Sequence, residues 1–85
     1  MLPTPQMLAR VLVTLRKGVL DPAGQAVANS LKQLGFDEVR GARIGKVIEF
    51  ELEDMPPEEA RKRLAQMGEQ LLANTVIEDF QVELT

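Results

Sequence analysis

Apolar and polar residues alternate in several short segments of this 85-residue chain, and this period predicts β-strands. The first segment is Met7–Leu15, in which every odd-numbered residue is apolar, so that one face of the strand can be buried. The other face carries Leu8 and Leu12 beside Arg10. Two leucines exceed what a water-facing surface needs, so we expect a partner, such as a second subunit, to cover this face.

Two segments show helical spacing instead. The first helix is predicted to begin with Asp21 as its N-cap and Pro22 in its first turn, and to end at Gly35, a typical left-handed C-cap. The second helix begins among the prolines and acids that follow Met55 and stops near Asn74. Its predicted apolar stripe contains Ala60, Leu64, Met67, Leu71 and Leu72.

Three further strands are predicted after the first helix. Gly45 can form a tight connection between a strand over Glu38–Ile44 and a second over Lys46–Glu53, and the last strand covers Val76–Leu84. The resulting order, βαββαβ, indicates an α+β ferredoxin-like fold, in which two helices lie on one face of an antiparallel sheet.

The domain organisation follows from the same pattern. Residues 1–6 contain two prolines and no apolar period, so they are interpreted as a flexible lead-in. Residues 7–85 are expected to form a single domain.

Composition restricts the chemistry. The chain has no cysteine and no histidine, which removes thiolate nucleophiles, disulfides and the usual zinc ligands. A net charge of −3 and three phenylalanines as the only aromatic residues argue against nucleic-acid binding. No apolar stretch approaches the ~20 residues of a membrane span. We therefore expect a cytoplasmic protein that binds neither nucleic acid nor membrane.

Few residues suggest a reactive site. The loop Lys17–Gly24 could place an anion at a helix N-terminus, but Asp21 puts a negative charge there, so capping is the favoured interpretation. Glutamates 49, 51 and 53 share one strand face, which is typical of a solvated surface rather than a metal site. Arg43 and Lys46 flank Gly45 and could contact an anionic group, although a basic hairpin tip is more often surface decoration.

Five motifs in register resemble the PurS family, the small subunit of phosphoribosylformylglycinamidine synthase. They are VTL at the first strand, VLDPAG at the first helix, LGFDEV after it, then RIGK and LLANTVIEDF. With the residues that flank them, the resemblance spans about Val11–Leu84, nearly the whole chain. Thr75 stands where the family is expected to have proline, and the lead-in is longer than expected.

The resemblance implies a non-catalytic subunit of an ATP-dependent C–N ligase, which is not an enzyme alone. The complex would use ATP, Mg and glutamine to convert formylglycinamide ribonucleotide to formylglycinamidine ribonucleotide, the fourth step of purine biosynthesis. This chain would bind no cofactor or metal and would bridge a large synthetase subunit and a glutaminase subunit.

The resemblance also implies a homo-oligomer, either a homodimer or a dimer of dimers. The residues predicted for the contact between copies are Leu8, Arg10 and Leu12, and those predicted for the contact with a partner subunit are Arg43 and Lys46. An ACT-like domain that senses a small molecule through the loop Lys17–Gly24 is the alternative, because it has the same order of elements.

Overall fold

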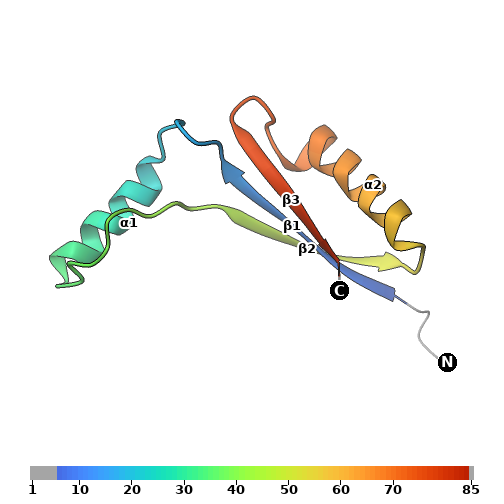
Figure 1. Cartoon of the computed structure of the whole chain (residues 1–85), viewed down its shortest axis with the longest axis horizontal. Helices are drawn as coiled ribbons and strands as arrows, with labels where there is room; N and C mark the ends of the chain where they lie inside the picture. The colour runs from blue at the N-terminus through green and yellow to red at the C-terminus, as the bar shows by residue number, and fades with distance from the viewer. Residues whose placement is uncertain (1–5, 85) are drawn as a thin grey trace.

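A single antiparallel sheet, with its first strand in the middle, organises the computed structural model, which describes residues 6–84 (Figure 1). The strand order is β2-β1-β3, and β1 pairs with both neighbours. The elements are β1 (Gln6–Leu15), α1 (Pro22–Gln33), β2 (Lys46–Glu53), α2 (Pro57–Met67), the π-helical turn η1 (Gly68–Leu72) and β3 (Glu78–Leu84).

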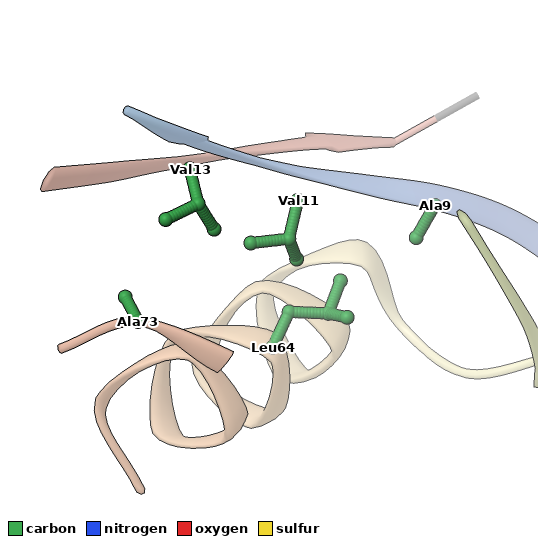
Figure 2. Close-up of a cluster of buried hydrophobic side chains, with 5 residues drawn as sticks. All are labelled: Ala9, Val11, Val13, Leu64 and Ala73. Atoms are coloured by element: carbon green, nitrogen blue, oxygen red, sulfur yellow. The ribbon is translucent and has the colours of Figure 1, made fainter. Parts of the chain in front are cut away.

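The core lies between the central strand and α2 (Figure 2). Ala9, Val11 and Val13 project from one face of β1, and Leu64 of α2 and Ala73 pack against them. Val11 and Leu64 are each 0% exposed, so this contact is the centre of the core. The odd-numbered face of the first strand is therefore buried, as its sequence period predicts.

The opposite side of the sheet, which we call the outer face, is fixed by the strand register. Leu8 lies opposite Glu51 on β2, and Leu12 lies opposite Val47. Arg10 lies between glutamates on both neighbouring strands, because it pairs with Glu49 of β2 and Glu83 of β3.

The helix α1 lies beyond one end of the sheet instead of over it (Figure 1). The radius of gyration, 17.0 Å, exceeds the roughly 12 Å that a compact chain of this length would have. Gly24 and Ala28 are buried on the side of α1 next to the returning chain, where a Cβ atom on residue 24 would meet the Ala42 carbonyl oxygen. The expectation that both helices cover one sheet face is thus not met by α1.

The predicted strand over Glu38–Ile44 is also not formed, so the sheet has three strands. This segment runs back along α1, beyond the end of the sheet, where no strand is available for pairing. Its last amide donates instead to the side chain of Asp21. The α+β class with an antiparallel sheet is confirmed.

Both predicted helix boundaries of α1 are confirmed. The Asp21 side chain caps the first turn, and Gly35 has a φ of 103°, which only glycine adopts readily. The amide of Phe36 donates to the Leu31 carbonyl and that of Gly35 to Lys32, the paired bonds of a Schellman motif.

At the chain ends, Gln6 is the first residue of β1 and does not belong to a lead-in, whereas residues 1–5 and Thr85 lie outside the described part of the chain.

Candidate interaction surfaces

The loop Lys17–Gly24 is closed by a carboxylate. Asp21 accepts a 2.8 Å hydrogen bond from the Gly24 amide at Oδ1 and a 2.9 Å bond from the Ile44 amide at Oδ2. The amides of Ile44 and Gly24, followed by the positive charge of Arg43, hold the pKa of Asp21 below its usual value against the opposing effect of burial. Because this anion already occupies the N-terminus of α1, the loop is a helix cap, as predicted, and is poorly suited to a phosphate or carboxylate ligand.

Arg43 has a role that its sequence position did not indicate. Its Nη2 donates to the backbone carbonyls of Leu15 and Arg16, both at 3.0 Å, where β1 ends and the chain leaves the sheet. The guanidinium therefore ties the chain returning from α1 to the end of β1. Lys46 is exposed at the start of β2, opposite Val13.

A second tie joins β1 to the turn before β3. Arg16 lies 3.4 Å from the Asp79 carboxylate and also donates to the Thr75 carbonyl. Asn74 organises the same turn, because its carbonyl accepts from the amides of Ile77 and Glu78. Thr75 thus provides a backbone acceptor, a function that proline can also fulfil. The sequence contains no local signal for this contact, since Arg16 and Thr75 are far apart in the chain.

The outer face brings together the three residues predicted to contact another copy. Leu8 is 56% exposed, Leu12 is half-buried, and Arg10 is exposed between them. A hollow on this part of the sheet is lined by Leu8, Ala9, Arg10, Glu49, Phe50 and Glu51. The face therefore combines apolar side chains with an acidic rim.

Sequence reasoning missed a second group of exposed apolar side chains, which lie on or next to α1. Leu34 is 74% exposed, and the group also contains Leu20, Val27, Phe36 and Ile44. The helical period of α1 is visible in the sequence, but the predicted fold places both helices on one face of the chain's own sheet. Only the displacement of α1 exposes these residues.

Residues 6–84 contain no group of three or more acidic, histidine or cysteine side chains arranged to hold a metal ion. None of the helices in this part of the chain is long and apolar enough to cross a membrane.

Comparison with known proteins gives a consistent result. Residues 8–85 match the family model PurS, described as phosphoribosylformylglycinamidine (FGAM) synthase. The phosphoribosylformylglycinamidine synthase subunit PurS of Synechocystis is 54% identical over 76 residues, which cover 89% of this chain and 76% of that relative.

Solved structures agree with the sequence match. The PurS subunit of Thermotoga maritima superposes with a TM-score of 0.86 at 30% identity, covering 95% of this chain and 93% of that one. A chain in the structure of PurLQS from the same organism also gives a TM-score of 0.86, at 29% identity, with 96% and 100% covered. With this fold and a family match over nearly its entire length, the chain belongs to the PurS family.

Proposed function

We propose that this chain is the small, non-catalytic subunit of a split phosphoribosylformylglycinamidine synthase and that it bridges the synthetase and glutaminase subunits. The observation that carries the proposal is the family match over residues 8–85, together with the fold shared with a chain of the PurLQS structure. In this role the chain supplies binding surface, and the other two subunits bind ATP, Mg and glutamine.

The distribution of polar groups supports a binding role. Among the described residues, Asp21 is the only charged or polar side chain that is buried, and both of its carboxylate oxygens already accept backbone amides. A general base or nucleophile needs an atom that is free to reach a substrate. The exposed apolar side chains near α1 and on the outer face are suited instead to contacts with other protein surfaces.

Two surfaces are proposed for these contacts. The outer face, with Leu8, Arg10 and Leu12, is the contact between copies of the chain in a homodimer or a dimer of dimers. The corner formed by Arg43 and Lys46 is the contact with the synthetase subunit. Arg43 uses one nitrogen, Nη2, for the carbonyls of Leu15 and Arg16, which leaves its other donors available to an acidic group on that subunit. The complex is proposed to work in the cytoplasm.

The proposal is tested by assembly. The chain is mixed with the synthetase and glutaminase subunits from the same source, and the mixture is analysed by size-exclusion chromatography with light scattering. We expect one complex that contains all three chains, whereas the two large subunits alone should not co-elute. Co-elution of the two large subunits that is equally strong without this chain would contradict the bridging role.

A further inference from the structure

A groove lies between α1 and the segment that returns from it to β2. Its volume of about 440 Å³ falls in the range of sites that bind small molecules. One side of α1 contributes Gln25, Asn29 and Lys32, and the returning segment contributes Arg40 and Gly41. Gly41 has no side chain, and nothing lies within 4 Å of the position that its Cβ atom would take. The backbone there is therefore open to a ligand.

Four side chains in the groove have no partner within the described part of the chain. Gln25, Asn29, Lys32 and Arg40 are exposed and make no side-chain hydrogen bond or ion pair among residues 6–84. Lys32 and Arg40 give the groove a charge of +2, whereas the whole chain has a net charge of −3. The helix dipole favours a cation in the last turn of α1, where Lys32 lies, but it does not account for Arg40 on the other wall. No acidic residue lines the groove in the described chain, so an anion that enters it meets two free cations.

The groove stays accessible when the apolar side of α1 is covered. Gln25, Asn29 and Lys32 recur at positions i, i+4 and i+7, so they lie along one side of the helix. The same spacing, begun two residues later, gives the apolar side of the helix, which consists of Val27, Leu31 and Leu34. Two residues correspond to roughly 200° around a helix, so the two sets lie on opposite sides. A protein that contacts the apolar side therefore leaves the polar side free.

The side chains of the groove match a phosphate group next to hydroxyl groups. The planar guanidinium of Arg40 can donate two parallel hydrogen bonds to a phosphate, and the Lys32 ammonium adds a second positive charge. A phosphate monoester carries about two negative charges at neutral pH, which these two cations balance. The carboxamides of Gln25 and Asn29 lie one turn apart, and each can both donate and accept a hydrogen bond. The hydroxyl groups of a sugar need this combination of donor and acceptor.

We propose that this groove binds a sugar phosphate, with its phosphate between Lys32 and Arg40 and its hydroxyl groups on Gln25 and Asn29. The inference goes beyond the proposed function, in which this chain supplies surfaces for other proteins and binds no small molecule. The site is also distinct from the loop Lys17–Gly24, where the Asp21 carboxylate occupies the N-terminus of α1.

The isolated chain, isotopically labelled for NMR, allows a direct test. Ribose 5-phosphate is the probe, and it is added at constant ionic strength because salt screens exposed charges. We expect saturable shifts of the side-chain amides of Gln25 and Asn29 and of the backbone amide of Gly41. Ribose, which lacks the phosphate, should give no saturable shift. A titration without saturation, or shifts confined to residues outside the groove, would overturn the proposal.

Inorganic phosphate distinguishes a sugar phosphate site from a site for any anion. The sugar hydroxyls add hydrogen bonds to Gln25 and Asn29, so ribose 5-phosphate should bind more tightly than inorganic phosphate by about fivefold or more. Asn29→Ala should reduce this preference without weakening the binding of inorganic phosphate. Equal affinity of the unsubstituted chain for the two probes would overturn the proposal, because the groove would then hold an adventitious ion only.

Two double variants with the same net charge test the role of the cations. Lys32→Gln, Arg40→Gln should lower the affinity for ribose 5-phosphate by about tenfold or more, because charge-assisted hydrogen bonds are lost. The matched variant Arg61→Gln, Lys62→Gln removes the same charge from exposed positions on α2 and should bind the probe as the unsubstituted chain does. An equal loss in both variants would overturn the proposal, because it would indicate a general attraction of anions. These measurements use the isolated chain, so their failure would leave the proposed bridging function standing.

Discussion

The side chain of Asp21 accepts a 2.9 Å hydrogen bond from the backbone amide of Ile44, 23 residues away. This bond joins the chain just before α1 to the chain that returns from it. The same carboxylate caps α1 through the Gly24 amide. One acidic residue therefore fixes both where the helix begins and where the chain returns to the sheet. We therefore expect the position of α1 to depend on this carboxylate being ionised.

The pH dependence of these two hydrogen bonds follows from the pKa of Asp21. Donation from Ile44 and Gly24 lowers the pKa of Asp21 in the folded state below the ordinary 3.8. The stabilisation is therefore complete above pH 3.8 and is lost as the pH falls through the lower, folded-state value. We expect the protection factor of the Ile44 amide, which is the intrinsic hydrogen-exchange rate divided by the observed rate at the same pH, to fall over that acidic range.

The variant Asp21→Asn should remove this acid-dependent step and accelerate exchange at Ile44 already at neutral pH, because an amide has one acceptor oxygen where the carboxylate uses two. Asp37→Asn is the control, because Asp37 is an exposed acidic residue between Asp21 and Ile44 in the chain. An unchanged exchange rate at Ile44 in Asp21→Asn would show that the carboxylate does not hold α1 in place.

The core contact between Val11 and Leu64 should dominate the stability of the sheet. Leu64→Ala removes a fully buried side chain and leaves a cavity, which typically costs about 2–5 kcal/mol in the free energy of unfolding. Leu71→Ala, at a position that is 83% exposed, should change the free energy by about 0.5 kcal/mol or less. Urea denaturation measures both, and equal costs would place the core elsewhere.

Gly68, the first residue of η1, lies against the Phe80 ring of β3. A Cβ atom at this position would lie 2.6–2.8 Å from three ring carbons of Phe80. Displacing the Phe80 ring should lower the free energy of unfolding by about 1–3 kcal/mol. This loss exceeds the roughly 1 kcal/mol by which alanine stabilises a helix relative to glycine. Gly68→Ala should therefore lower the free energy of unfolding by roughly 1 kcal/mol.

Two further variants test whether the cost arises from this contact. In a Phe80→Leu background, Gly68→Ala should cost less, because the ring is absent. Gly41→Ala is a suitable control, since nothing lies within 4 Å of a Cβ atom there. A cost of Gly68→Ala that does not change with Phe80→Leu would exclude the steric explanation.

Arg43 and Lys46 should differ in their effects. Arg43→Ala removes both bonds to the carbonyls of Leu15 and Arg16, so it should loosen the segment returning from α1 even in the isolated chain. Lys46→Glu should leave the isolated chain unchanged and weaken binding to the synthetase subunit at least tenfold, which titration calorimetry measures. Full binding by Lys46→Glu would remove this corner from the proposed contact.

The sequence predicted local features better than their placement. The alternation in β1, the cap at Asp21 and the left-handed Gly35 depend on neighbouring residues, and all three are confirmed. The predicted strand over Glu38–Ile44 was wrong because pairing needs a neighbouring strand, and the displacement of α1 carries this segment away from the sheet.

The candidate surfaces could likewise be predicted where they depend on neighbouring residues in the chain, and could not where they depend on the placement of elements. Leu8, Arg10 and Leu12 share a face because a strand alternates, so their grouping could be predicted. The contact of Arg43 with the end of β1 could not, because it joins residues 27 and 28 positions apart. The exposure of Val27 and Leu34 likewise depends on where α1 lies rather than on its own sequence.

In the proposed function, this chain makes the other subunits work together without carrying out chemistry itself. The most direct test is glutamine-dependent synthase activity of the synthetase and glutaminase subunits, measured with and without this chain at saturating ATP and Mg. We predict activity that appears only when the chain is present and saturates at a fixed stoichiometry. Equal activity of the two subunits in its absence would contradict the bridging role.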